Sequence, residues 1–195
     1  MKIAFEGPDG TGKTTCAKTL ARMLEWEYVE KPLSLFFKDG AESPEFKYYL
    51  STMYALKDTQ VKAWFMGLGD LMVAKSDSNI IIDRHFASNY FWNGTKESDP
   101  IFKALIKLGG KPNITFLLCA SVETRIKRMN KRNPNDLDLL DPEKKVLMYD
   151  KMEAFLKKFQ IPYHRIDTDD KDEEQVLNAV VDKLGKYKHL LEYKS

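Results

Sequence analysis

The chain has 195 residues, enough to bury one substantial core and too few to predict two independent domains. Its 31 basic and 29 acidic residues leave a formal charge of +2, without the basic excess that is typical of proteins that bind nucleic acid polymers. No apolar run is long enough to span a bilayer, and the first residues do not read as a signal peptide. We therefore expect one cytoplasmic domain over residues 1–195, with no membrane partner.

Strand-like and helical patterns alternate along the chain. Apolar segments of strand length cover residues 2–6, 27–30, 79–83, 113–120 and 162–167. Helical patterns cover residues 13–24, two helices within 44–76, and residues 100–108, 122–132, 141–159 and 173–193. The third and fourth strands are apolar throughout, which is typical of strands covered on both faces. The alternation predicts an α/β fold, a doubly wound parallel five-stranded sheet flanked by helices.

The segment between the first predicted strand and the first predicted helix matches the G-x-x-x-x-G-K-[ST] pattern of phosphate-binding loops in full. It consists of Gly7, Pro8, Asp9, Gly10, Thr11, Gly12, Lys13 and Thr14, followed by Thr15. Its glycines allow a turn that points backbone N–H groups inward, and the helix presents its positive dipole end to the same anion. We expect ATP here, with Lys13 on the β- and γ-phosphates and the Thr14 hydroxyl on Mg²⁺.

With its flanking residues, this loop resembles the thymidylate kinase family, to which the deoxynucleoside kinases are related. The family pattern E-G-x-[DE]-G-x-G-K-[ST]-T is matched by residues 6–15, and the acidic residue inside the loop, Asp9, is its distinguishing position. The resemblance implies a P-loop fold of the nucleoside monophosphate kinase type, in which Asp9 contacts the sugar hydroxyl of the acceptor. Asp9 could instead be a turn residue that hydrogen-bonds its own backbone.

The third predicted strand ends in Asp-Arg-His-Phe-Ala-Ser-Asn, which is similar to the family motif Asp-Arg-Tyr-x-x-Ser. Ligands bind at the carboxyl ends of strands in open α/β sheets. The resemblance implies that Asp83 orients Mg²⁺ or accepts the acceptor's proton, and that Arg84 neutralises charge during transfer. By position, Ser88, Asn89 and Trp92 would line the base and sugar pocket. The alternatives are a helix-capping Asp-Arg pair and a helix face packed in the core.

Three arginines, Arg125, Arg128 and Arg132, share one face of the helix after the fourth strand. In nucleotide kinases such arginines belong to a lid that closes over ATP. The resemblance therefore implies a short helical lid at about residues 125–141, with Arg128 and Arg132 as catalytic groups. The alternative is a solvated basic face. Tyr149, on the next predicted helix, matches a family tyrosine near the acceptor base, although it could equally be a core residue.

The second predicted strand departs from the family pattern. The chain contains no arginine from residue 23 to residue 83, whereas the family holds the acceptor's phosphate with an arginine in an Arg-Glu-Pro motif at this point. Lys31 and Lys57 could replace it only as point charges. Deoxynucleoside kinases instead have a glutamate before the proline as the base for the sugar hydroxyl. Glu30 is the candidate for that role, one residue further from Pro32 than that pattern expects.

Together, the loop and the resemblance predict an ATP- and Mg²⁺-dependent kinase of a deoxynucleoside monophosphate, with dTMP the first choice. A deoxynucleoside kinase acting on a 5′-hydroxyl is the alternative, and a non-catalytic nucleotide-binding module is the third hypothesis. The acceptor would be a small molecule. Because relatives are commonly dimers, the apolar helices within residues 48–72 could form a homodimer contact, or could be core. Residues 167–174 are expected to be no more than a solvated turn.

Overall fold

The computed structural model describes residues 1–135 and 146–187, and its centre is a parallel sheet of five strands. The strands are β1 (Lys2–Glu6), β2 (Glu27–Glu30), β3 (Ile80–Asp83), β4 (Ile114–Cys119) and β5 (Tyr163–Asp167). They are ordered β2-β3-β1-β4-β5, and every neighbouring pair is parallel. The predicted fold is confirmed, and the predicted strand bounds lie within one residue of the observed ones.

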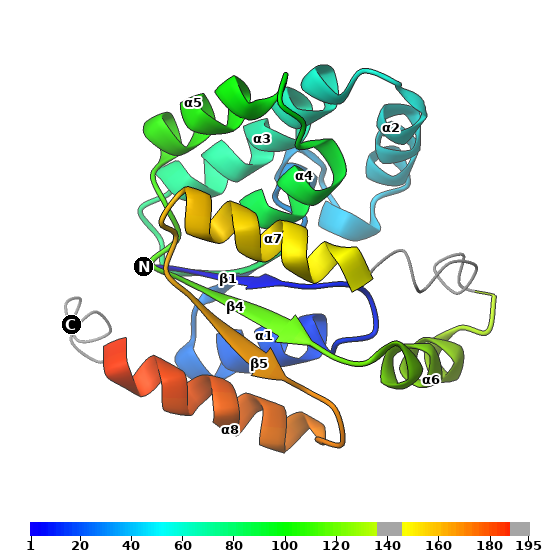
Figure 1. Ribbon diagram of the computed structural model, residues 1–195, viewed down its shortest axis with the longest axis vertical. Coiled ribbons are helices and arrows are strands. Elements are labelled where there is room, and N and C mark those ends of the chain that lie inside the picture. Colours follow the sequence, from blue (N-terminus) through cyan, green and yellow to red (C-terminus); the bar gives the residue numbers. More distant parts are fainter. Residues whose placement is uncertain (136–145, 188–195) are drawn as a thin grey trace.

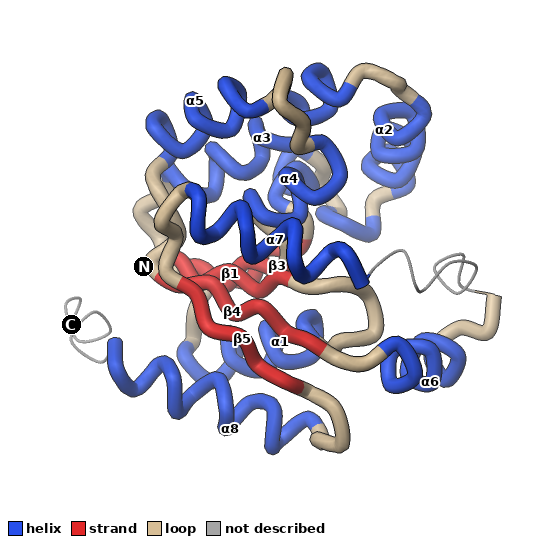
Figure 2. Tube along the Cα trace, viewed as in Figure 1, coloured by secondary structure: helices blue, strands red, loops and turns tan. Residues whose placement is uncertain are grey.

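Helices cover both faces of this sheet (Figures 1 and 2). They are α1 (Lys13–Leu24), α2 (Pro44–Ala55), α3 (Thr59–Lys75), α4 (Phe86–Asn93), α5 (Asp99–Gly109), α6 (Val122–Arg132), α7 (Val146–Lys158) and α8 (Glu173–Leu184). α1 and α8 lie on one face, and α3, α4, α5 and α7 lie over the other. None of the described helices combines the length and the apolar character that a membrane span requires.

The central strands are apolar throughout because both of their faces are covered. Every residue of β3 and of β4 is buried. Along β4 the side chains alternate between two clusters: Phe116 and Leu118 pack with α1 and α8, whereas Leu117 and Cys119 pack with the helices of the opposite face. A polar side chain in this sheet can reach a ligand only where a strand ends, so the carboxyl ends of β1, β2 and β3 are where a site is expected.

The hydrophobic pattern does not predict α4, which was considered only as the alternative to a ligand site after the Asp-Arg pair, and the start of this eight-residue helix shows why. The residue before the helix, His85, provides no side-chain cap. The cap comes from Glu6 at the end of β1, whose Oε1 accepts hydrogen bonds from the backbone N–H groups of His85, Ala87 and Ser88 at 3.0, 3.0 and 3.2 Å. A helix start that is stabilised by a residue some eighty positions earlier leaves no local signal in the sequence.

Two helices differ from their predicted bounds. α8 ends at Leu184 and continues as a 3-10 turn, Gly185–Tyr187, so the predicted extension to residue 193 lies partly outside the described residues. The predicted start of the preceding helix at residue 141 also lies outside them, and α7 is described from Val146. The single region 44–76 is divided as expected, because Asp58 caps α3 by accepting from the N–H groups of Gln60 and Val61.

Candidate active site

The loop between β1 and α1 is packed so closely that two of its positions admit only glycine. Gly10 has φ +83°, and a Cβ on it would lie 2.8 Å from the backbone oxygen of Arg125 in α6. A Cβ on Gly7, at φ +135°, would lie 2.4 Å from the backbone oxygen of Leu118 at the end of β4. The loop is therefore held between β4 and α6, and it leads into α1 at Lys13. This is the strand, loop and helix arrangement that the motif requires.

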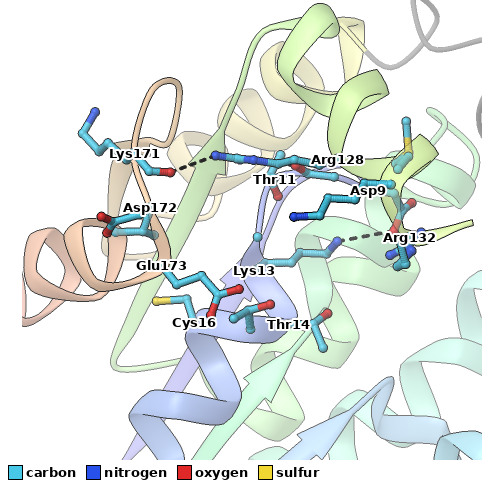
Figure 3. A pocket seen from close by; sticks show the side chains of 16 residues that line it. Asp9, Thr11, Lys13, Thr14, Cys16, Arg128, Arg132, Lys171, Asp172 and Glu173 are labelled. Atoms are coloured by element: carbon cyan, nitrogen blue, oxygen red, sulfur yellow. Dashed lines mark hydrogen bonds and ion pairs between the residues drawn. The ribbon is translucent and has the colours of Figure 1, made fainter.

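A cavity of about 600 Å³ opens above this loop (Figure 3). Its size is that of sites for nucleotide-sized ligands. Three elements line it: the loop and the first turn of α1, the last turns of α6, and the start of α8. The lining residues from α6, from the β5–α8 connection and from α8 are Arg128, Met129, Lys131, Arg132, Lys171, Asp172, Glu173 and Val176. The connection was expected to be only a solvated turn. Asp172 and Glu173 are exposed as expected, but residues 171–173 also form a wall of the cavity.

Lys13 and Asp9 line the cavity, and Arg84 contacts the same Asp9 carboxylate. The Lys13 ammonium is buried and lies 3.5 Å from Asp9 Oδ1 and 3.2 Å from the backbone oxygen of Pro8. Arg84 Nη2 donates to the same Asp9 oxygen at 2.5 Å. Burial lowers the pKa of Lys13, and the neighbouring Arg84 cation lowers it further, while Asp9 raises it. One carboxylate thus joins two cations that would otherwise repel each other, in a position where an anionic ligand can replace it.

The backbone at Arg84 is fixed by hydrogen bonds to two residues of β1. It has φ +73°, which is uncommon for a residue with a side chain and marks a strained turn. Its own N–H donates to the Phe5 oxygen at 2.9 Å, and the following N–H, that of His85, donates to Glu6. Burial raises the pKa of Glu6, although Ser88 and the backbone groups that donate to it oppose the rise. Glu6 was expected only as the first residue of the loop pattern; in the structure it fixes the backbone that follows Arg84.

Asp83 ends β3 and receives the hydroxyl of Thr14. The Thr14 Oγ1 donates to Asp83 Oδ2 at 2.5 Å, and the two residues predicted to orient Mg²⁺ are therefore in direct contact. Asp83 is 1 % exposed, and its Oδ1 has no hydrogen-bond partner among the described residues. A buried carboxylate oxygen without a partner is costly unless a cation or a water completes it. A hydroxyl and a carboxylate are hard oxygen ligands, so this pair fits Mg²⁺.

Glu30 lies beside Asp83, because the register of β2 on β3 pairs the two residues. Its carboxylate lies 3.3 Å from the ammonium of Lys31 and 4.0 Å from that of Lys18. The Tyr28 hydroxyl approaches both carboxylates, at 3.4 Å from Glu30 and 3.2 Å from Asp83. Glu30 thus lies beside Asp83, and its role toward a ligand stays a prediction. Tyr28 has the sequence pattern of an ordinary strand residue and was not singled out.

The other residues predicted to bind the acceptor nucleotide differ in their exposure to solvent. The Ser88 hydroxyl donates to Glu6, and Asn89 Nδ2 lies 3.1 Å from the Ala63 oxygen and 3.2 Å from Asp70 Oδ2. Both side chains are buried. Trp92, by contrast, is 52 % exposed on α4. The buried pair is engaged within the protein, so contact of Ser88 or Asn89 with a ligand stays a prediction.

Tyr149 belongs to the packing of α7 against the end of β4. Its hydroxyl donates to the Ala120 oxygen and accepts from the Ala120 N–H, both at 3.0 Å, and the residue is buried. Burial raises its pKa to about 12. Contact with an acceptor base is not needed to satisfy this hydroxyl. The core alternative describes what is observed.

The three arginines of α6 have three different environments. Arg125 is fully buried and its Nε donates to the Asp9 oxygen at 2.8 Å, which excludes a solvated role for it. Arg128 Nη2 donates to the oxygens of Thr168 and Lys171 at 2.7 and 3.1 Å, and so ties α6 to the β5–α8 connection. Arg132 is exposed at the cavity rim (Figure 3). Residues 136–141 of the predicted lid lie outside the described residues.

The strand order β2-β3-β1-β4-β5, with a phosphate loop after β1 and an Asp-Arg pair after the neighbouring β3, defines the class of the P-loop kinases. Comparison with known proteins agrees. The family described as an AAA domain matches residues 2–173. A protein of Archaeoglobus fulgidus named "Probable thymidylate kinase" is 33% identical over 145 residues, which cover 68% of this chain and 70% of the relative.

The chain belongs to the thymidylate kinase family and carries this AAA domain. A "Probable thymidylate kinase" of Methanocaldococcus jannaschii is 29% identical over 97% of this chain and 98% of its own length. Among solved structures, thymidylate kinase from Candida albicans covers 96% of this chain and 92% of its own, with a TM-score of 0.69 and 17% identity. Deoxyadenosine kinase from M. mycoides covers 96% of this chain and 100% of its own, with a TM-score of 0.65 and 22% identity. These two structures support the fold.

Proposed function

We propose that the protein transfers the γ-phosphoryl group of ATP to a deoxynucleoside monophosphate, with dTMP as the first candidate. The observation that carries the proposal is the convergence of two cations on one Asp9 oxygen, with the Lys13 ammonium at 3.5 Å and the Arg84 guanidinium at 2.5 Å. An acidic residue inside the phosphate loop is the position that separates this family's pattern from that of the deoxynucleoside kinases. The thymidylate kinase names of the relatives support the same acceptor.

The residues of the chain would act mainly by positioning and by charge. The loop amides from Gly7 to Thr15 and the Lys13 ammonium would bind the triphosphate, while Arg84 would face the charge that develops as the phosphoryl group moves. Thr14 and Asp83 would hold Mg²⁺, which when bound neutralises phosphate charge and orients the phosphate oxygens. Arg132 at the rim would close over ATP, and Arg128 would keep α6 in place for that closure.

The acceptor would lie at the carboxyl ends of β2 and β3. Asp9 would accept a hydrogen bond from the sugar hydroxyl of the acceptor, and this bond would replace one of its ion pairs with Lys13 and Arg84. Trp92, the exposed aromatic residue of α4, is the predicted pocket residue that is open to a ligand, whereas Ser88, Asn89 and Tyr149 are buried and hydrogen-bonded within the protein.

A deoxynucleoside kinase is the second candidate, and one observation favours it. Glu30 and Asp83 place two carboxylates side by side where the acceptor's phosphate would otherwise need cations, and the cations within 4.0 Å of the Glu30 carboxylate in the described residues are those of two lysines. An acceptor with a 5′-hydroxyl would bring no negative charge to this point, and Glu30 could take its proton.

One assay separates the candidates. ADP release from ATP is measured for deoxynucleosides and for their monophosphates, with the Lys13→Ala variant as the control for contaminating kinases. Turnover with dTMP and none with thymidine supports the first proposal. The reverse pattern supports the second, and absence of turnover with every acceptor would support a non-catalytic nucleotide-binding module.

We also propose that the protein forms a homodimer through α3. Large apolar side chains recur on its exposed side at helical spacing: Val61, Trp64, Leu68 and Met72, which are 49, 44, 48 and 38% exposed. Leu68→Glu should yield monomers in sedimentation velocity, because it buries a charge in the contact. Leu147→Glu, at a leucine of α7 that is 68% exposed, is the matched control and should leave the dimer intact. A wild-type monomer at micromolar concentration would rule the contact out.

A further inference from the structure

The hydroxyl of Tyr28 occupies a position that strand packing alone does not require. β2 and β3 are parallel neighbours, and Tyr28 pairs with Ile81 while Glu30 pairs with Asp83. Side chains alternate along a strand, so all four point to the sheet face that is covered by α1. The Tyr28 ring packs against the core cluster of that face. A phenylalanine would fill the same space, and the oxygen therefore needs a separate explanation.

Two carboxylates and one ammonium surround this hydroxyl. Its oxygen lies 3.2 Å from Asp83 Oδ2 and 3.4 Å from Glu30 Oε2. The Lys18 ammonium lies 5.4 Å from the centre of the ring and 4.0 Å from Glu30. A phenol has a single proton to donate, and the shorter distance favours Asp83 as its acceptor. Glu30 has Lys18 and Lys31 as partners of its own.

The two oxygens of Asp83 therefore differ in their hydrogen-bond partners. Oδ2 accepts from Thr14 at 2.5 Å and from Tyr28 at 3.2 Å, whereas Oδ1 has no partner within the described part of the chain. Two donors on one oxygen, arriving from α1 and from β2, fix the rotation of the carboxylate. That rotation leaves the other oxygen available to a cation or a phosphate-bound water.

We propose that Tyr28 is a positioning residue, which holds the Asp83 carboxylate through Oδ2 so that Oδ1 is presented to the magnesium of bound nucleotide. The inference rests on the proposed function, because it assigns Asp83 to the metal. It adds a third member to the predicted Thr14 and Asp83 pair.

The test removes only the oxygen. Tyr28→Phe is compared with Tyr163→Phe, a matched control, since the Tyr163 hydroxyl also donates to a carboxylate, that of Glu153, at 2.6 Å, but at the amino-terminal end of β5. Calorimetry measures ATP affinity with Mg²⁺ and with EDTA for each protein, and steady-state assays add kcat, KM and the Mg²⁺ concentration for half-maximal rate. Thermal unfolding shows that each variant is folded.

We expect Tyr28→Phe to reduce the Mg²⁺-dependent gain in ATP affinity about tenfold or more, the equivalent of a lost hydrogen bond to a charged group. Affinity in EDTA should be unchanged, kcat should fall by a similar factor, and acceptor KM should change little. Tyr163→Phe should match wild type in all of these. Unchanged Mg²⁺ dependence in a folded Tyr28→Phe, or an equal effect in both variants, would overturn the proposal.

The outcome remains informative if the proposed function fails. Wild-type protein that turns over no acceptor would refute the kinase proposal. The calorimetric comparison would still decide whether Tyr28 acts on the metal.

Discussion

Replacing Gly10 by alanine tests the close contact between the loop and α6, two elements that line the cavity. Gly10 and Gly12 have the same φ, +83°, so alanine at either position carries the cost of a left-handed backbone, about 1–2 kcal/mol. They differ in surroundings. A Cβ on Gly12 meets nothing within 4 Å, whereas a Cβ on Gly10 meets the oxygen, Cα and Cβ of Arg125 at 2.8, 3.0 and 3.1 Å. Backbone atoms cannot turn away, and overpacking of this kind costs about 1–3 kcal/mol more.

Urea unfolding of the ligand-free variants, followed by far-UV circular dichroism, measures this difference. We predict that Gly10→Ala loses about 1–3 kcal/mol more unfolding free energy than Gly12→Ala, with the same m-value. The overlap should also move α6, which carries Arg128 and Arg132, away from the loop. Equal losses in the two variants would refute the claim that the loop packs on α6, and would remove the basis for a cavity shaped by both.

Arg84→Ala should lower kcat about 100-fold or more with a smaller change in acceptor KM, because the cation is expected to act in the transition state; an effect on KM alone would argue against that role. Asp9→Asn should weaken acceptor binding and leave ATP affinity in EDTA near wild type, as measured by calorimetry, and a loss of ATP binding instead would show that Asp9 acts on the loop. Burial lowers the pKa of His85 to about 4, so between pH 6.5 and pH 4 the unfolded chain binds a proton at this residue and the folded chain does not. The free energy of unfolding therefore decreases by about 3 kcal/mol as the pH falls from 6.5 to 4, and this contribution is fully present above pH 6.5. Urea unfolding should therefore show a steeper acid loss for wild type than for His85→Phe, and parallel curves would contradict this sign.

The fold was predictable because its signals are local. Each strand is a short apolar run between turn residues, and the phosphate-loop motif predicts both a strand before it and a helix after it. α4 was missed because its cap, Glu6, is distant in sequence, and helix starts are recognised from neighbouring residues.

The site was predictable where a motif fixes spacing, and less so elsewhere. Lys13, Thr14, Asp83 and Arg84 come together as expected, since strand ends of a parallel sheet share one edge. The spacing of Arg125, Arg128 and Arg132 on α6 predicts one shared face and could not reveal that Arg125 is buried against the loop. The Tyr28 hydroxyl contacts Asp83 of the neighbouring strand β3, and the residues of one strand do not reveal which strand pairs with it.

Binding of ATP tests the central claim most directly. Calorimetric titration of the wild-type protein with ATP and excess Mg²⁺ should show a saturable one-site heat, and the same titration of folded Lys13→Ala should show a large loss of affinity. Absence of any heat with well-folded wild-type protein, or equal affinity in the two proteins, would contradict the assignment of this loop as the triphosphate site.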